Sequence, residues 1–276
     1  MTHRNQRCTV VRGLPVSAVV ALGAAILPAA AQPVVASTQA RTAAVTAEHR
    51  GWTGSGEFGY ASASGNSRSQ NINAKVGVGF EDDKWLHQAS AGLLKSKGEV
   101  DVDGNADGID EEQYESTADR YNVLASSAYK LTQRSYLVGT VRYDHDEFNT
   151  YLWQGTAGLG YGYRWFDNER TRLLTEIGPA FRRVHNVDRG VEDDAVARGV
   201  VDFSYVLTPT TTLLNTFLVE SGRLNTYVQN DLGLQVAMTD ALALKAGYQV
   251  RHNSDVGPGF DRTDTLTTLN IVYRVD

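Results

Sequence analysis

The sequence predicts an all-β protein, an antiparallel up-and-down transmembrane β-barrel of about 12 strands. Three observations lead to this prediction. Apolar and polar residues alternate along most of the chain from residue 51 onward, and short and long connections alternate between these segments. No apolar run beyond residue 31 approaches the roughly 20 residues that a membrane helix needs. Strands of a membrane barrel place only every second residue against lipid, which agrees with the mean hydropathy of −0.31.

The composition excludes some classes of function. The chain has 276 residues with 26 Lys and Arg against 32 Asp and Glu, a formal net charge of −6. This acidic balance argues against a nucleic-acid partner, because phosphates attract a basic surface. The single cysteine, Cys8, precedes the expected mature chain, so we expect no disulfide bond.

The N-terminal residues are typical of an export signal. A start with three arginines precedes an apolar stretch from Leu14 to Leu27, and Ala29-Ala30-Ala31 supplies the small residues that signal peptidase accepts. We predict a signal peptide at 1–31, a periplasmic lead-in at 32–50 and an outer-membrane barrel at 51–276. A buried N-terminal helix is the alternative, but the basic–apolar–small order favours export.

The alternation has the period of a β-strand, in which successive side chains point to opposite faces. In the segment 72–80, for example, apolar residues occupy the even positions and polar residues or glycines the odd ones. The segments 52–60, 157–165, 242–250 and 268–275 follow the same rule. Such segments, of roughly 10 to 15 residues, are long for soluble strands but suit a tilted membrane crossing.

The connections between these segments fall into two classes. We expect tight turns at 82–83, 132–133, 167–168, 208–209 and 239–240, and longer loops at 64–67, 98–116, 148–150, 186–193, 222–225 and 255–261. This alternation implies about twelve strands, with both ends of the barrel on the short-turn side. Outer-membrane barrels have this layout, with short periplasmic turns and longer outer loops.

The aromatic residues favour a membrane barrel over a soluble one. A soluble sandwich or lipocalin-like barrel would pack large residues inside, whereas here the inner parity carries glycines and charges. Tyr and Trp suit the headgroup level, with the ring in the apolar layer and the polar tip in water. Towards the strand ends the apolar parity carries Trp52, Tyr60, Phe80, Trp85, Tyr143, Trp153, Trp165, Tyr205 and Tyr273.

Two stretches resemble a known bacterial family. One is Trp52-Thr-Gly-Ser-Gly-Glu57 followed by Ser64-Gly65-Asn66-Ser67; the other runs from Tyr248 through Asn253-Ser254, Pro258 and Thr263-Asp264-Thr265 to Tyr273-Arg274. The family is the salt-induced outer-membrane proteins (YdiY-like), a domain family of unknown function. The resemblance covers most of 51–276. It implies a Gram-negative outer-membrane β-barrel linked to osmotic or salt stress, with no established substrate.

The C-terminus departs from one feature of that family. Such proteins commonly end on an aromatic residue that the insertion machinery reads. Here Val275-Asp276 follow Arg274, and Tyr273 is the nearest aromatic residue. The insertion signal therefore differs from the family pattern, while the predicted fold does not.

The charged residues of the inner parity form the first candidate site. One interpretation is a narrow polar pore whose basic excess favours anions. The other is a lumen filled by charge pairs; twelve strands lie between filled barrels and open porins. Inner glycines at 77, 79, 158, 160 and 162 favour open space. By parity the inward charges are Glu57, Lys75, Lys130, Arg142, Arg164, Glu176, Arg182, Arg198, Asp202, Asp231, Lys245, Arg251 and Arg274.

An acidic segment, Glu99 to Glu115, is the second candidate. Asp103, Asn105 and Asp107, followed by Gly108, match the first six positions of a calcium loop. The bidentate Glu of that motif would fall at position 114, which is a tyrosine. In the frame that starts at position 101 the Glu fits, but an alanine replaces the glycine. We expect a solvated outer loop, with weak Ca²⁺ binding as the alternative and no other cofactor.

His252 and Ser254 form the third candidate. Their i, i+2 spacing would place a base and a nucleophile on one strand face, and Asp264 on the neighbouring strand could orient the histidine. The family resemblance accounts for Ser254 without catalysis. We therefore expect no enzymatic activity and keep an outer-membrane lipid hydrolase as an alternative.

The sequence thus favours an outer-membrane barrel that acts as a passive small-solute channel linked to salt or osmotic stress. A non-conducting structural barrel is the first alternative. The expected partners are outer-membrane lipids, lipopolysaccharide and the barrel-insertion machinery, and no nucleic acid. The sequence does not specify the oligomeric state.

Overall fold

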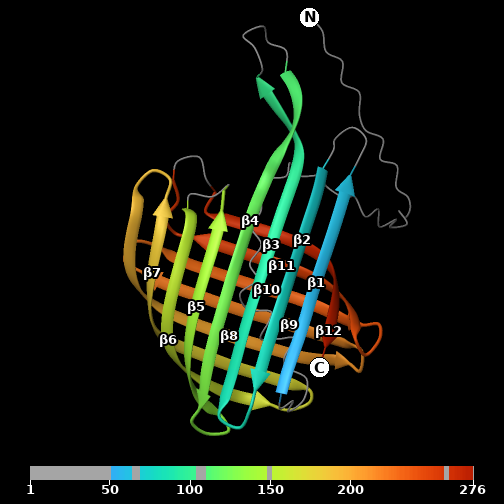
Figure 1. Ribbon diagram of the computed structural model, residues 1–276, viewed down its shortest axis with the longest axis vertical. Coiled ribbons are helices and arrows are strands. Elements are labelled where there is room, and N and C mark those ends of the chain that lie inside the picture. The colour runs from blue at the N-terminus through green and yellow to red at the C-terminus, as the bar shows by residue number, and fades with distance from the viewer. Residues whose placement is uncertain (1–50, 64–68, 104–109, 148–150, 258–260, 276) are drawn as a thin grey trace, which may run out of the picture.

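The described part of the chain forms a closed barrel of twelve antiparallel strands (Figure 1), as the sequence predicts. The computed structural model describes residues 51–63, 69–103, 110–147, 151–257 and 261–275. Each strand pairs with its neighbours in the sequence, and β1 pairs with β12. The strands are β1 (Gly51–Ala63), β2 (Ser69–Glu81), β3 (Trp85–Asp103), β4 (Asp110–Lys130), β5 (Ser135–Asp146), β6 (Tyr151–Asp167), β7 (Thr171–Asn186), β8 (Gly190–Thr208), β9 (Thr211–Gly222), β10 (Thr226–Ala237), β11 (Leu242–Asn253) and β12 (Thr263–Val275).

Closure of the barrel gives the backbone N–H and C=O groups of the first and last strands hydrogen-bond partners. The seam between β1 and β12 runs from the pair Gly54↔Val275 to the pair Phe58↔Ile271. A spanning sheet has to close in this way, because lipid offers no partner for a free N–H or C=O group. No helix in the described ranges is long and apolar enough to cross a membrane.

The connections separate into a turn end and a loop end. Each predicted tight turn lies at a junction between consecutive strands, for example residues 82–84 between β2 and β3. Two predicted loops are wrong in extent. β3 and β4 remain paired out to Asp103↔Asp110, and β8 already begins at Gly190. Polar side chains do not stop a strand outside lipid as long as the backbone ladder continues.

The β3–β4 hairpin projects beyond the loop end of the barrel (Figure 1). The register between the two strands shifts at Ser96/Lys97, a β-bulge of the kind that increases local twist. Most of the segment 99–115 therefore belongs to a strand pair, and only 104–109 lie outside the described residues. The expectation of a long acidic loop is corrected accordingly.

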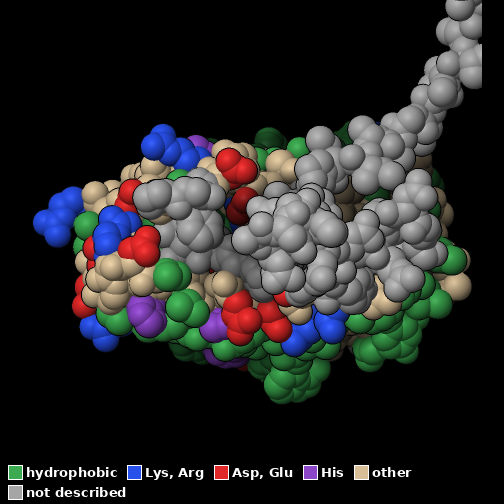
Figure 2. Space-filling view, turned by 90° about the horizontal axis from the view of Figure 1, so that it is seen from above, with side chains coloured by type: hydrophobic (Ala, Val, Ile, Leu, Met, Phe, Trp, Pro, Cys, Tyr) green, Lys and Arg blue, Asp and Glu red, His purple; other side chains and the backbone are tan. Residues whose placement is uncertain are grey.

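The outer wall is apolar. Leu159, Ile177 and Leu269 are 72%, 70% and 63% exposed, as expected for side chains that contact acyl chains. Aromatic residues lie near both ends: Trp85 stacks edge-on against Tyr129 near the turn end, and Tyr121 stacks on His145 near the loop end. Seen from the loop end, charged side chains and histidines gather at the rim (Figure 2). The predicted outward aromatics are confirmed.

The N-terminal predictions lie outside the described residues. This applies to the signal peptide at 1–31 and the lead-in at 32–50, and also to Asn105 and Asp107 of the calcium hypothesis. These remain predictions.

Candidate functional site in the barrel lumen

The charged residues assigned to the lumen are all buried or half-buried. Strand parity explains this placement, because alternate residues share one face of the sheet. Glu57, Arg142, Glu176, Arg182, Asp202, Asp231, Lys245 and Arg251 are buried. The remaining five, Lys75, Lys130, Arg164, Arg198 and Arg274, are half-buried.

The central contact of the lumen is made by Arg142 of β5. Its Nη2 lies 2.9 Å from Oε2 of Glu220 on β9, and its guanidinium lies 5.3 Å from the ring centre of Tyr227 on β10. In the closed order of strands, β9 and β10 are four and five places from β5. These contacts therefore cross the lumen from wall to wall.

Two carboxylates extend this contact into a network. Glu220 also lies 3.8 Å from Nε of Arg198, whose Nη1 is 3.3 Å from Oε2 of Glu176. The Tyr136 hydroxyl donates a hydrogen bond of 3.0 Å to Oε1 of Glu176. Both glutamates are thus buried with a cation beside them, the condition under which a buried charge is tolerated.

A second crossing lies nearer the turn end. Nη2 of Arg164 on β6 is 3.8 Å from Oε1 of Glu81 on β2, four strands away, and Nζ of Lys130 is 2.6 Å from the same oxygen. The Arg164 guanidinium also lies 5.8 Å from the ring centre of Tyr136. Charge and aromatic surface together occupy this level of the lumen.

The inner glycines of β6 accommodate packing and do not leave open space. A Cβ added at Gly162 would overlap the Tyr136 ring, and one at Gly158 would lie 2.9 Å from the Cβ of Ala180. The interpretation of these glycines as a sign of an open pore is therefore wrong. A glycine can equally mark the place where a large side chain from the next strand comes close.

The wall formed by β10, β11, β12 and β1 has its own row of polar contacts. Nζ of Lys245 lies 3.1 Å from each carboxylate oxygen of Glu57. On β10, the Tyr227 hydroxyl donates to Oε1 of Gln229 at 2.6 Å, and the Gln229 amide donates to Asp231 at 2.5 Å. This row continues from the central Arg142–Tyr227 contact towards Asp231.

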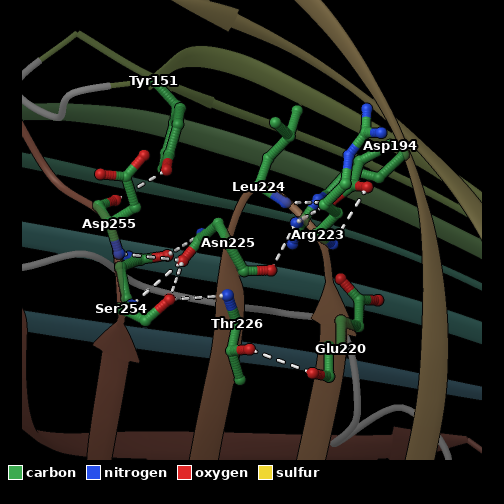
Figure 3. Close-up of polar contacts among 12 residues, drawn as sticks. Tyr151, Asp194, Glu220, Arg223, Leu224, Asn225, Thr226, Ser254 and Asp255 are labelled. Carbon is green, nitrogen blue, oxygen red and sulfur yellow. Dashed lines mark hydrogen bonds and ion pairs between the residues drawn. The ribbon is translucent and has the colours of Figure 1, made fainter.

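At the loop end, the β9–β10 turn is tied to the barrel (Figure 3). The backbone N–H groups of Arg223 and Leu224 donate to the Asp194 carboxylate at 3.2 and 3.1 Å. Arg182 bridges the two parts: its Nη2 lies 3.2 Å from Asp194 Oδ2 and donates to the Asn225 carbonyl at 2.7 Å. The turn is therefore held at the lumen by a buried ion pair.

The same turn holds the start of the β11–β12 connection (Figure 3). Oδ1 of Asn225 accepts hydrogen bonds from N and Oγ of Ser254 and from N of Asp255, at 3.0, 3.1 and 3.2 Å. Ser254 Oγ in turn accepts from the Thr226 N–H at 2.8 Å. One amide side chain thus fixes both connections.

Asp255 carries the third crossing, over the mouth. Its carbonyl accepts from the Tyr151 hydroxyl of β6 at 2.8 Å, and its carboxylate is 2.6 Å from Nη2 of Arg189 in the β7–β8 turn. The hydrogen bond to Asp255 raises the pKa of Arg189 above its usual value. Segments from opposite sides of the mouth are therefore linked through Asp255.

The basic excess expected for the lumen is reduced by charged residues that were not among those assigned by parity. Four charged residues that take part in buried ion pairs were not assigned from the sequence. Glu220 pairs with Arg142, and Asp194 pairs with Arg182. Arg120 and Asp146 pair with each other. Asp194, Asp146 and Arg120 share the parity of assigned residues on their own strands, so for these three the signal was present in the alternation, whereas β9 carries no assigned charge beside Glu220. The pairing partners lie on other strands and no spacing along the chain reveals them.

The contacts of Ser254 and His252 do not support the lipid hydrolase hypothesis. Ser254 Oγ is engaged by Asn225 and Thr226, while His252 Nδ1 lies 2.9 Å from the Thr263 hydroxyl. Asp264 cannot orient His252, because it is paired opposite Arg251 and shares its inward parity. The proposed role of Asp264 is therefore wrong.

The calcium hypothesis remains untested by the structure. Asp103 is the last residue of β3, and the two other predicted ligands lie outside the described residues. Within the ranges that the structure describes, no group of three or more His, Cys, Asp or Glu side chains is placed to hold a metal ion.

These features define the class of protein. A closed twelve-strand sheet with an apolar, aromatic-lined exterior and a polar interior has the surface of a barrel surrounded by lipid. The protein is an outer-membrane β-barrel.

The chain belongs to the family described as "Protein of unknown function, DUF481", whose model matches residues 56–275. The family resemblance noted in the sequence is thereby confirmed. The chain is 24% identical over 218 residues to the uncharacterized protein YdiY of Escherichia coli (strain K12), covering 79% of this chain and 81% of that protein.

Solved structures with a similar arrangement are distant in sequence. The translocator domain of the autotransporter NalP from Neisseria meningitidis has 13% identity and a TM-score of 0.49, over 86% of this chain and 93% of that one. The NanC porin has 13% identity and a TM-score of 0.48, over 80% and 98%. An outer membrane channel from Pseudomonas putida F1 has 12% identity and a TM-score of 0.47, over 84% and 97%.

Proposed function

We propose that the protein is a structural component of the outer membrane, a barrel whose lumen is filled and does not conduct. The observation that supports a filled lumen is a set of contacts that cross it at three levels. These contacts are Arg164 to Glu81, Arg142 to Glu220, and Tyr151 to Asp255. A pore would need a continuous water path between such levels.

The burial of the crossing residues supports this proposal. Arg182 and Glu220 are 1% exposed and Arg142 is 4% exposed, so almost none of their surface is open to solvent. Two cavities beside lumen residues have volumes of about 40 and 20 Å³. Each has room for only about one to three water molecules.

The link to salt stress is part of the same proposal. Buried ion pairs are screened far less by dissolved salt than exposed ones. A barrel braced by Arg142–Glu220 and Arg182–Asp194 would therefore keep its bracing when the external ionic strength rises. This would suit a component that stiffens the envelope under salt stress.

Planar-bilayer recording tests the proposal. The purified wild-type barrel is expected to give no discrete conductance steps, whereas the double variant Arg142→Ala/Glu220→Ala, which clears the central crossing, should give them. Steps from the wild type would overturn the proposal and favour the passive small-solute channel. If the double variant also gives no conductance steps, the contacts at the other two levels would be enough to block the lumen. Adding Asp255→Ala to the double variant would test this.

The proposal includes no enzymatic activity. Because Ser254 Oγ is bonded to Asn225 and Thr226, we assign it a structural role. Wild type and Ser254→Ala are both expected to leave phospholipid and lipid A unchanged. Hydrolysis products that the wild type forms and Ser254→Ala does not would establish the lipid hydrolase instead.

The proposed partners follow from the surface. The apolar exterior would contact outer-membrane lipids and lipopolysaccharide, and the barrel-insertion machinery would place the sheet in the membrane.

A further inference from the structure

A polar cavity of about 40 Å³ lies inside the barrel between β1, β2, β10, β11 and β12. Glu57, Lys75 and Asp231 contribute charged groups to its wall, and Asn73 and Asn270 contribute amides. It belongs to neither the central crossing at Arg142 nor the mouth at Asp255. The hydrogen bonds that the atoms of its wall make, or lack, indicate what kind of molecule the cavity can hold.

Four polar atoms of the wall are inaccessible to solvent and have no hydrogen-bond partner among the described residues. One is a donor, Nζ of Lys75; the others are acceptors, Oδ1 of Asn73, Oδ1 of Asn270 and Oε1 of Gln249. Native proteins rarely leave such atoms unpaired, because a desolvated donor or acceptor has lost its bonds to water. A cluster of four around one cavity indicates a missing common partner.

The other polar groups of the wall are engaged. Glu57 accepts from Lys245 and, at 3.4 Å, from the Asn270 amide. Asp231 accepts from the side-chain amides of Gln229 and Gln249. The partner must therefore accept from one ammonium group and donate to several amide oxygens.

Charge and size restrict the partner further. The carboxylates of Glu57 and Asp231 balance the ammonium groups of Lys75 and Lys245, and Arg251, which also acts on Asp231, is paired opposite Asp264 of β12. A charged guest would add an uncompensated charge to a buried site, so the guest is neutral. At 10–15 Å³ for each water-sized probe, the cavity has room for about three water molecules.

Gly59 of β1 makes room for two of these amide oxygens. A Cβ at this position would overlap Oδ1 of both Asn73 and Asn270, and it would lie 3.0 Å from the carbonyl of Leu269. The glycine thus allows two unpaired amide oxygens to lie together beside the cavity. Gly56 on the same strand has nothing within 4 Å of its added Cβ and provides a matched control.

We propose that this cavity is a binding site for small uncharged hydrogen-bonding molecules, and that a cluster of about three waters occupies it and bridges Lys75 to the surrounding amide oxygens. The site goes beyond the proposed structural function, because it gives the filled lumen one hydrated chamber. Its waters complete the polar row that runs along β10 from Tyr227 to Asp231.

Two measurements on the full barrel test the site. A crystal structure that resolves ordered solvent should show peaks within about 2.7–3.2 Å of Lys75 Nζ and of at least two of the amide oxygens. In detergent micelles, nuclear Overhauser effects from long-lived water should reach the α protons of Gly59 and not those of Gly56. An empty cavity, or wall side chains that bond directly to one another, would overturn the proposal.

Variants make the test specific. Gly59→Ala should remove bridging water peaks and the water contact at position 59, whereas Gly56→Ala should retain them. If Gly59→Ala does not fold, Lys75→Met serves instead, and the peak bonded to Nζ should disappear while the barrel remains folded. Unchanged water peaks in both variants would show that the waters do not depend on these groups, which would also overturn the proposal.

Discussion

Arg142 shows how one side chain joins opposite walls of the barrel. It lies on β5, pairs with Glu220 of β9 and covers the Tyr227 ring of β10. The pair is buried on both sides, so the charges depend on each other to offset lost hydration. The mutual dependence of the two charges can be measured by comparing the stability of a variant that lacks one partner with that of a variant that lacks both.

Arg142→Ala should destabilise the barrel by about 3–5 kcal/mol, because it leaves Glu220 buried without its main cation. The pair of changes Arg142→Met/Glu220→Leu should cost much less, since no charge remains unpaired. Thermal unfolding followed by circular dichroism and by the heat-dependent shift in gel mobility would measure both. Equal losses in the single and double variants would contradict a mutual dependence of the two charges.

Asp82 is a second case at the residue scale, in the turn between β2 and β3 outside the membrane. Its Oδ1 accepts from the backbone N–H groups of Lys84 and Trp85 at 2.8 and 2.7 Å. These hydrogen bonds hold the pKa of Asp82 below its ordinary value. A lowered pKa means that the carboxylate stabilises the turn above the unfolded pKa of about 3.9, and that this support is lost as pH falls through the folded value.

Acidification should therefore loosen this turn in the wild type. Hydrogen exchange at the Lys84 and Trp85 amides, corrected for intrinsic rates, should accelerate as pH falls below about 4. Asp82→Asn retains an acceptor that does not titrate, so its protection should not change over this range. A wild type as insensitive to pH as the variant would refute the role of the carboxylate.

At the scale of elements, the mouth depends on the link between two connections. Asn225 joins the β9–β10 turn to the start of the β11–β12 connection through three donors on Ser254 and Asp255. The buried apolar clusters found among the described residues include none from 222–225 or 254–257, so hydrogen bonds hold these parts of the two connections. Removing one acceptor should release both.

Asn225→Ala should increase hydrogen exchange of the Ser254 and Asp255 amides by roughly 10- to 100-fold, which corresponds to unsatisfied donors worth about 1–3 kcal/mol. Exchange in the strands should not change. Ser221→Ala, which removes only a hydroxyl contact to Thr226, is the control. Protection that survives in Asn225→Ala would show that Arg189 and Tyr151 hold Asp255 without the amide.

At the scale of the whole molecule, buried and exposed ion pairs should differ in how much added salt weakens them. Arg142–Glu220 and Arg182–Asp194 are buried, whereas Lys95–Asp119 and Arg183–Asp193 are largely exposed. The screening length falls from about 8 Å at 0.15 M salt to about 3 Å at 1 M, and it acts mainly on charges in water. Exposed pairs contribute only about 0–1 kcal/mol in any case.

The unfolding temperature of the wild type should therefore change little between about 0.15 and 1 M NaCl. The loss caused by Arg142→Ala should be the same at both concentrations. The loss caused by Arg183→Ala should be small and should disappear at the higher one. A wild-type barrel that loses stability steeply with salt would contradict bracing by buried pairs and weaken the proposed link to salt stress.

The sequence alone determined the barrel. Alternation from residue 51 onward fixed which face of each strand meets lipid, because side chains in a strand change sides at every residue. Turn chemistry at sites such as Asp82 and Thr239 fixed the number of strands. The inward orientation of the charged residues followed from the same parity.

Only the tertiary structure decided what fills the lumen. Strand order and tilt bring Arg142 opposite Glu220, 78 positions away, and Lys245 opposite Glu57, 188 positions away. The space left by Gly162 is occupied by the Tyr136 ring, and that left by Gly59 is occupied by the amide oxygens of Asn73 and Asn270. The physical reason is that the two-residue period specifies the face of a strand, while contacts across a closed sheet depend on register and curvature, which the period does not specify.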